Sequence, residues 1–161
     1  DRKHLIETLR RAAEHEGTAL VEIYQNCDIF NDGAFAPMKD IDTAEDTVMR
    51  LVHGEPIVFG KNLNKGVIRN AAGLLEVVRE EDAPHGFLIH DEQSMDPSYA
   101  FALSRLSHPE TLEDTPIGVF RNLPRAVYDR QMEQQLTTAV NAKGKGDLAK
   151  LLQGSDSWVV E

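Results

Sequence analysis

The single cysteine of the chain is the residue whose side chain offers the most reactive chemistry. Cys27 lies in the polar stretch Tyr-Gln-Asn-Cys-Asp-Ile-Phe-Asn over residues 24–31, outside any apolar run. Such a cysteine can be an inert buried thiol, a metal ligand or a nucleophile. The carboxylate of Asp28 would raise the pKa of the adjacent thiol, which counts against a nucleophile. The pattern favours an inert thiol, then a metal ligand, then a nucleophile.

The histidines offer a second source of metal ligands. The sequence His90-Asp91-Glu92 groups three ligand-type residues, but neighbours on a strand point to opposite faces, so they rarely form one ligand set. We expect surface roles for the six histidines, which are His4, His15, His53, His85, His90 and His108. No Gly-x-Ser-x-Gly elbow and no phosphate-binding loop with Lys-Ser/Thr is present, so those two kinds of site are set aside.

The composition narrows the class of protein. A formal net charge of −10 over 161 residues would repel a phosphate backbone, so nucleic acid is not expected as a partner. No run approaches the ~20 apolar residues of a membrane span, so no membrane association is expected. One cysteine excludes an intrachain disulfide and indicates a reducing compartment, which predicts a cytoplasmic location. Because the sequence has no starting Met, we expect it to begin inside a longer protein.

The N-terminal part of the chain predicts a helix, a strand and a loop in succession. Apolar residues recur at helical spacing over residues 5–13, and Gly17 follows as a helix stop. Residues 18–24 form a nearly unbroken β-favouring run, which is typical of a strand buried on both faces of a parallel sheet. The loop over residues 25–40 then carries Cys27 just beyond the end of this strand.

The remaining sequence predicts alternating strands and helices. We expect helices over residues 43–53, from Asp96-Pro97 to Leu106, over 127–140 and after Asp147, the last following a flexible joint at 143–146. Short β-favouring runs predict a three-stranded meander and two further strands. These runs are residues 56–60, 65–69 and 74–78 for the meander, then 86–90 and 116–120.

The stretch over residues 17–33, Gly-Thr-Ala-Leu-Val-Glu-Ile-Tyr-Gln-Asn-Cys-Asp-Ile-Phe-Asn-Asp-Gly, resembles a segment of the β subunits of thiamine-dependent 2-oxoacid:ferredoxin oxidoreductases. In that family a strand ends in a short polar step, a cysteine and an aromatic-Asn pair. The run Pro-Ile-Gly-Val-Phe-Arg at 116–121, followed by Pro124 and Tyr128, resembles the C-terminal order of the same subunit. Gln25 and Asn26 before the cysteine look most like the 2-oxoglutarate-type enzymes.

The resemblance implies an α/β fold. Residues 1–40 would end a thiamine-diphosphate-binding parallel-sheet domain and include the loop with the cluster ligand. Residues 41–161 would form a C-terminal α+β extension. Cys27 maps onto the fourth cysteine of a four-iron, four-sulfur (4Fe–4S) cluster, whose other three ligands the family supplies from an N-terminal segment absent here. The Gly-Asp-Gly motif and Asn that hold magnesium and thiamine diphosphate belong to that segment too.

The implied reaction is coenzyme A-dependent oxidative decarboxylation of a 2-oxoacid, most closely 2-oxoglutarate to succinyl-CoA, with electrons passed through the cluster to ferredoxin. The implied partners are the α subunit, ferredoxin, coenzyme A and the 2-oxoacid, and this chain alone would be inactive. Ferredoxins are acidic, so docking to a chain of net charge −10 would need a local basic patch or another subunit. Asn31 would either shape the loop beneath the cluster or simply form a turn.

Three alternatives remain open at the level of sequence. The substrate could be pyruvate or a branched 2-oxoacid, because the residues that recognise its side chain would lie outside this chain. The chain could be a structural and assembly module of the complex without chemistry of its own. It could also be related to a non-redox thiamine decarboxylase in which Cys27 is incidental.

Overall fold

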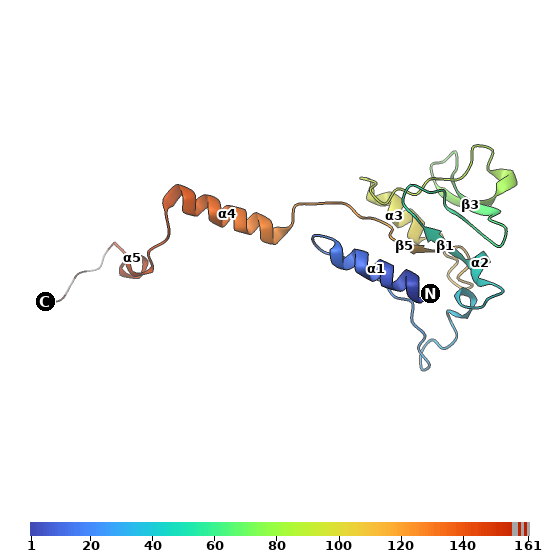
Figure 1. Ribbon diagram of the computed structural model, residues 1–161, viewed down its shortest axis with the longest axis horizontal. Coiled ribbons are helices and arrows are strands. Elements are labelled where there is room, and N and C mark those ends of the chain that lie inside the picture. The colour runs from blue at the N-terminus through green and yellow to red at the C-terminus, as the bar shows by residue number, and fades with distance from the viewer. Residues whose placement is uncertain (156–157, 159, 161) are drawn as a thin grey trace. The chain divides into compact units, whose positions relative to one another are not determined.

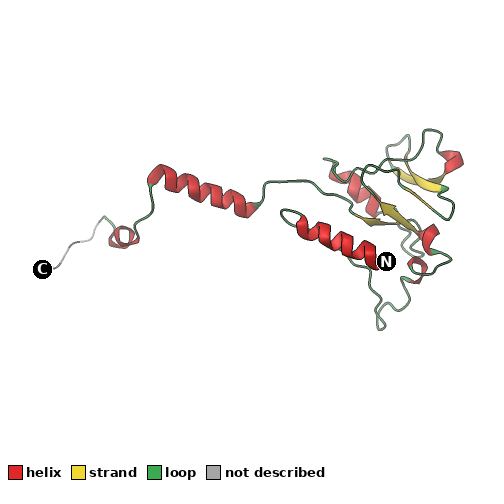
Figure 2. Ribbon diagram, in the orientation of Figure 1, coloured by secondary structure: helices red, strands yellow, loops and turns green. Residues whose placement is uncertain are grey.

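The computed structural model describes residues 1–155, 158 and 160 of the chain (Figure 1). The chain divides into two compact units, Asp1–Pro124 and Arg125–Glu161. The first unit is a mixed α/β structure that contains a small parallel sheet and a small antiparallel sheet (Figure 2). The division predicted near residue 40 stays a prediction.

The first helix confirms the predicted amphipathic segment. Helix α1 (Arg2–Glu14) begins after Asp1, whose carboxylate accepts a hydrogen bond from the backbone N–H of His4 at 3.0 Å. This side-chain cap satisfies a backbone donor that the first helical turn leaves without an intrahelical partner. The helix ends before Gly17, as the sequence predicts.

The predicted buried strand over residues 18–24 is wrong. These residues have no regular secondary structure, and the side chain of Leu20 is 96% exposed. A strand requires hydrogen bonds to a neighbouring strand, and no described segment pairs with residues 18–24. The β-favouring composition is therefore present without the partner that would turn it into a strand.

Parallel pairing occurs elsewhere in the first unit. Strand β1 (Val48–Leu51) pairs with β5 (Thr115–Gly118), with Val48 opposite Thr115. Strand β5 confirms the strand predicted at 116–120, shifted by one or two residues at each end. The sequence predicted a parallel sheet within residues 1–40. Among the described residues, the parallel pair lies outside that range.

The helix predicted over residues 43–53 is only partly correct. Helix α2 (Ala44–Thr47) is a single turn and leads directly into β1. Along β1, Met49 and Leu51 are buried while Arg50 between them is exposed. This alternation has a period of two residues, so the buried side chains face the core from a strand and not from a helix.

The antiparallel sheet confirms the predicted meander. Its strands β2 (Val58–Phe59), β3 (Lys65–Arg69) and β4 (Leu75–Arg79) lie in the order β2-β3-β4. Two short 3₁₀ helices, η1 (Ala36–Met38) and η2 (Glu80–Asp82), lie before α2 and after β4.

The strand predicted over residues 86–90 is reduced to isolated pairing. The backbone N–H of Leu88 donates to the carbonyl of Val67 at 2.7 Å, and the N–H of Ile57 donates to the carbonyl of Leu88 at 2.9 Å. A single bridge between Pro56 and Ile89 completes this contact. The segment therefore runs alongside the sheet without forming a regular strand.

Helix α3 (Pro97–Ser104) begins where the sequence predicts, because Asp96 caps it by accepting a hydrogen bond from the N–H of Ser98. It contributes two side chains to the core of the first unit. The buried core residues are Met49, Leu51, Ile57, Phe59, Val67, Tyr99 and Leu103.

The second unit consists of two helices, α4 (Tyr128–Lys143) and α5 (Leu148–Gln153), and both were predicted. Asp147 caps α5 by accepting a hydrogen bond from the N–H of Lys150 at 3.0 Å. None of the residues that the structure describes in this unit is buried. In the described part of the chain, no helix is both long and apolar enough to cross a bilayer.

Candidate functional site

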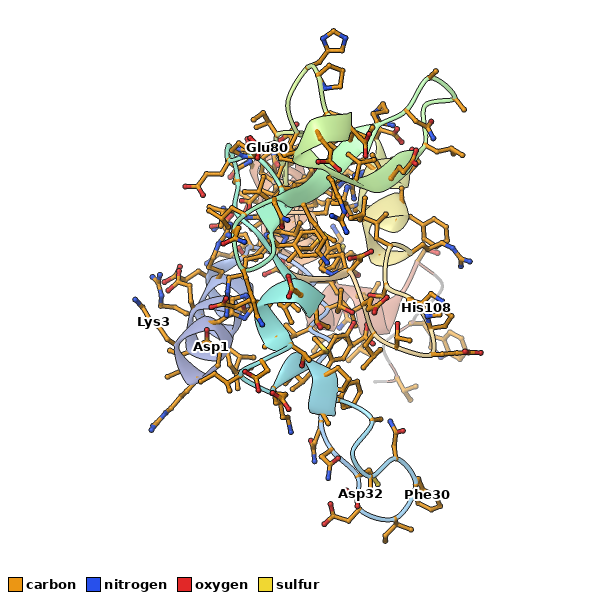
Figure 3. The ribbon with its side chains drawn as sticks, turned by 90° about the vertical axis from the view of Figure 1, so that its right-hand side faces the viewer. Asp1, Lys3, Phe30, Asp32, Glu80 and His108 are labelled. Atoms are coloured by element: carbon orange, nitrogen blue, oxygen red, sulfur yellow. The ribbon has the colours of Figure 1, made fainter. Side chains whose placement is uncertain are left out.

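The candidate site is the loop over residues 24–35, named the Cys27 loop below. The rings of Tyr24 and Phe35 stack at its two ends, with centroids 5.1 Å apart and planes inclined by 9°. Within the loop, the N–H of Asn31 donates to the carbonyl of Cys27 at 2.8 Å. Figure 3 shows Phe30 and Asp32 at the tip of this loop, which projects away from the rest of the first unit. The thiol therefore lies in a tight, projecting turn.

The sulfur of Cys27 is surrounded by backbone donors. Hydrogen bonds from the backbone of Phe30, Ile29 and Asn31 lower the pKa of the Cys27 thiol, and partial burial opposes them. The expectation that Asp28 would raise this pKa is therefore wrong in its net direction. Successive N–H groups in a turn stabilise an anion, which explains why the pKa is lowered despite the neighbouring acidic residue in the sequence.

Asn26 organises the loop, a role that was not predicted from the sequence. Its side-chain amide donates to Asp28 Oδ1 at 2.7 Å and to Asp32 Oδ1 at 3.1 Å. Its side-chain oxygen accepts the N–H of Gly33 at 2.9 Å, where Gly33 has a φ of 72°. The spacing Asn-x-Asp with Asp-Gly further on is the signal that could have indicated it.

Asn31 fills the turn-forming role, one of the two that the sequence left open for it. Its backbone N–H closes the turn onto the carbonyl of Cys27, and its backbone is one of the groups that lower the pKa of the thiol. The side-chain role considered for Asn31 in shaping the loop is thus filled by Asn26. Backbone contacts of this kind depend on the conformation of the turn, which no residue type alone reveals.

The Cys27 loop fits one position of an iron–sulfur site. Iron binds the thiolate form of cysteine, and hydrogen bonds to the sulfur both stabilise that form and tune the reduction potential of a cluster. In the described residues, no three His, Cys, Asp or Glu side chains gather in a way that could hold a metal. A metal held by the Cys27 thiolate would need its other ligands from outside the described residues.

His90 is buried, so the expectation of a surface role is wrong for it. Its side chain is 1% exposed, with Nε2 2.8 Å from the carbonyl oxygen of Val119 and Nδ1 3.0 Å from the hydroxyl of Tyr99. Nε2 must donate to the carbonyl, which leaves Nδ1 of the neutral ring to accept from Tyr99. Burial lowers the pKa of His90, so this neutral form is favoured.

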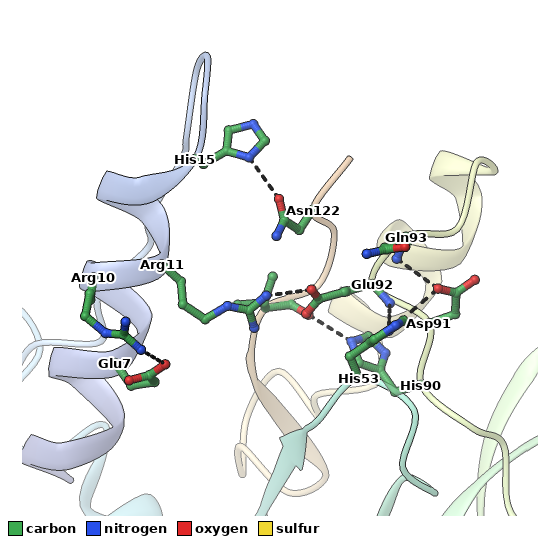
Figure 4. A network of polar contacts seen from close by, with 11 residues as sticks. Glu7, Arg10, Arg11, His15, His53, His90, Asp91, Glu92, Gln93 and Asn122 are labelled. Atoms are coloured by element: carbon green, nitrogen blue, oxygen red, sulfur yellow. Dashed lines mark hydrogen bonds and ion pairs between the residues drawn. The ribbon is translucent and has the colours of Figure 1, made fainter. Parts of the chain in front are cut away.

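A polar network holds α1 against the loops that follow β5 and precede α3 (Figure 4). Arg11 of α1 forms an ion pair with Glu92 at 2.5 Å, and the Glu92 side chain is only 6% exposed. His15 Nδ1 lies 2.8 Å from Asn122 Oδ1, and the N–H of Asn122 donates to the carbonyl of Glu92 at 2.7 Å. The buried carboxylate of Glu92 is thus paired with Arg11, and this ion pair helps to hold α1 in place.

One similar protein extends the description of the chain. The chain is 46% identical, over an alignment of 164 residues, to the 2-oxoglutarate oxidoreductase subunit KorB of Mycobacterium tuberculosis. The alignment covers all of this chain and 43% of that relative, so the chain spans less than half of the relative's length. No protein-family model matches the chain. No solved structure matches it either.

Proposed function

The chain is a homologue of part of a 2-oxoglutarate oxidoreductase subunit, and from this premise we propose that it forms the cluster-bearing C-terminal part of such a β subunit. Identity of 46% along the whole chain supports this assignment over an unrelated thiamine decarboxylase. The structural observation that carries it is the tight turn around Cys27, closed by the N–H of Asn31 on the carbonyl of Cys27 at 2.8 Å, in which backbone donors lower the pKa of the thiol.

Cys27 would hold one iron of a 4Fe–4S cluster in this proposal. When bound, the cluster would accept electrons singly and pass them on. The residues of this chain would stabilise the thiolate, because the backbone of Phe30, Ile29 and Asn31 bonds to the sulfur. Asn26 would keep these donors in place through its bonds to Asp28, Asp32 and Gly33.

The reaction of the complete complex would convert 2-oxoglutarate, coenzyme A and two equivalents of oxidised ferredoxin into succinyl-CoA, carbon dioxide, a proton and two equivalents of reduced ferredoxin, each carrying one electron. Thiamine diphosphate and magnesium would be held by parts of the complex outside this chain. The α subunit and ferredoxin would be its protein partners. Assaying the complete complex against 2-oxoglutarate, pyruvate and branched 2-oxoacids tests the substrate, and a preference for pyruvate would overturn the 2-oxoglutarate assignment.

The decisive experiment substitutes the proposed ligand in the complete complex. We expect Cys27→Ser to lower the iron content and to change the electron paramagnetic resonance spectrum of the reduced cluster, because an alcohol is a poor replacement for a thiolate ligand. Ala34→Ser is the matched control, since it adds a hydroxyl to the same loop without altering the thiol. Unchanged iron content and electron transfer in Cys27→Ser would instead support a purely structural module.

A further inference from the structure

Helix α4 carries an apolar stripe that stays exposed in the described part of the chain. Met132, Leu136 and Val140 follow one another at intervals of four residues, so their side chains lie along one face of the helix. These side chains are 36%, 60% and 43% exposed. A helix with this pattern normally buries its apolar stripe against another element. The stripe therefore makes α4 a surface that is suited to a partner.

Two opposite charges lie on the same face, one at each end of the stripe. Asp129 is seven residues before Leu136, and Lys143 is seven residues after it. Seven residues are close to two full turns of an α-helix, so these three side chains point in nearly the same direction. Neither Asp129 nor Lys143 forms an ion pair with any described residue. The surface made by Asp129, Met132, Leu136, Val140 and Lys143 is named the α4 face below.

The α4 face is complementary to a second α4 face that runs in the opposite direction. When two copies of Leu136 meet on a twofold axis, residues equally distant from Leu136 on its two sides face one another across the pair. Met132 then packs against Val140 of the second copy, and Asp129 lies opposite Lys143 of the second copy. Symmetry forms each of these contacts twice. A parallel pair would instead bring Asp129 against Asp129 and Lys143 against Lys143.

The distribution of charge along the chain also permits this pairing. Residues 125–161 contain five basic and five acidic side chains, so the second unit is neutral and the net charge of −10 belongs to the first unit. Two second units therefore have no net charge with which to repel one another. Antiparallel packing also places the positive N-terminal end of each helix dipole beside the negative C-terminal end of the other.

We propose that the α4 face pairs with the α4 face of a second copy of this chain, as a symmetric antiparallel helix pair. Helix α4 has 16 residues and is therefore about 24 Å long. Two helices of this length bury less surface than the ~1,600 Å² of a standard stable interface, so the isolated chain associates weakly and reversibly. The pairing goes beyond the proposed function and does not depend on a cluster at Cys27.

Sedimentation equilibrium of the full chain tests the pairing, in the presence of a reductant that prevents disulfide dimers through Cys27. We expect a monomer–dimer equilibrium at millimolar concentration. Leu136→Asp should lower the association constant at least about a hundredfold, because it brings two carboxylates together on the twofold axis. Gln134→Asp is the matched control, because it adds the same charge on the opposite face of α4. A chain that stays monomeric, or a dimer that persists in Leu136→Asp, would overturn the proposal.

Charge reversal tests the antiparallel direction. Asp129→Lys and Lys143→Asp should each lower the association constant by at least about threefold, because each replaces two attractions with two repulsions. The double variant should regain the association, because opposite charges again face one another. Circular dichroism of each variant measures whether α4 remains helical. In a parallel pair all of these variants would associate equally, so a double variant that is no better than the single ones would contradict the antiparallel pair.

Engineered cysteines locate the twofold axis in the chain and in the complete complex. With Cys27→Ser as the background, Leu136→Cys should form a disulfide between two copies on oxidation, whereas Gln134→Cys should not. Met132→Cys should crosslink to Val140→Cys on a different copy. If the amides of α4 became protected only when the α subunit was added, and Leu136→Cys gave no crosslink, the face would belong to the α subunit and the proposal would be wrong. Iron content is measured on a complex that retains Cys27, because loss of the cluster would refute the proposed function and leave the α4 pairing intact.

Discussion

At the scale of single residues, the pKa of Cys27 depends on backbone groups whose positions the sequence does not reveal. The nearest charged side chain, Asp28, suggests a raised thiol pKa, but the backbone donors of the turn lower it. Asp28 is itself engaged by the amide of Asn26 at 2.7 Å. The identity of the candidate ligand could be read from the sequence, whereas the direction of its pKa shift required the folded turn.

We predict that Asn26→Ala loosens the Cys27 loop and raises the pKa of its thiol towards the usual range. The substitution removes the bonds to Asp28, Asp32 and Gly33 that hold the turn. The pH dependence of Cys27 alkylation by iodoacetamide measures this shift. Asn70→Ala is the control, because Asn70 holds a different turn by accepting the N–H groups of Ala72 and Leu74. Identical alkylation profiles for Asn26→Ala and the unsubstituted chain would refute the role of Asn26.

His90 makes a second prediction at this scale, in which acid destabilises the first unit. Burial lowers the pKa of His90 in the folded chain below its ordinary value of 6.5. The unfolded chain therefore takes up a proton near pH 6.5 while the folded chain resists it, so protonation favours unfolding. The stabilisation is complete above about pH 6.5 and is lost as the pH falls through the lowered pKa.

Urea unfolding followed by circular dichroism at several pH values measures this effect. We expect His90→Gln to lower the free energy of unfolding at neutral pH, because it disturbs the bonds to Val119 and Tyr99, and to flatten its decline in acid. His85→Gln, at an exposed loop position, should leave the decline intact. An equally steep decline in both variants would show that another group causes it.

At the scale of elements, local signals predicted the helices better than the strands. Capping residues such as Asp96 and Asp147 act within one turn, so the starts of α3 and α5 follow from the sequence. The meander of β2, β3 and β4 was also predictable, because its strands are neighbours in the chain. Strand β1 was missed because its partner β5 is distant in sequence. The strand expected at residues 18–24 failed for the related reason that no described segment pairs with it.

Gly66 of β3 lies so close to neighbouring atoms that it leaves no room for a side chain, and this close packing can be tested. A Cβ at this position would lie 2.5 Å from Phe87 Cδ1 and 2.6 Å from the carbonyl oxygen of Ile57. We expect Gly66→Ala to lower the free energy of unfolding by about 1–3 kcal/mol, because a backbone atom blocks the simplest relaxation. Gly146→Ala meets nothing within 4 Å and is the control. Equal unfolding midpoints for the two variants would contradict the close approach.

At the scale of the whole molecule, the buried core belongs to one of the two units. Every buried residue of the core lies within Asp1–Pro124, and none of the described residues from Arg125 onwards is buried. The apolar stripe of α4 was correctly predicted from its spacing, but the described residues of its own unit do not bury it. Spacing reveals an amphipathic helix without revealing what covers it.

We therefore predict that removing residues 125–161 leaves the stability of the first unit unchanged. The deletion should reduce the helical signal in circular dichroism, because it removes α4 and α5. The midpoint of urea unfolding of the remaining chain should stay the same within error. Tryptophan fluorescence is unsuited to this measurement, because Trp158 lies in the deleted unit and is 83% exposed. A clear fall in the midpoint would show that the second unit contributes to the core.

The pairing of β1 with β5 has a practical consequence for a chain that is cut. Residues 48–51 pair with residues 115–118, so the chain between the two strands leaves the parallel sheet and returns to it. The exposed turn at residues 71–73 is a natural site for a protease. A single cleavage there should yield two peptides that migrate together on a native gel and separate only in denaturant. The reason is that β1 on one peptide stays hydrogen-bonded to β5 on the other.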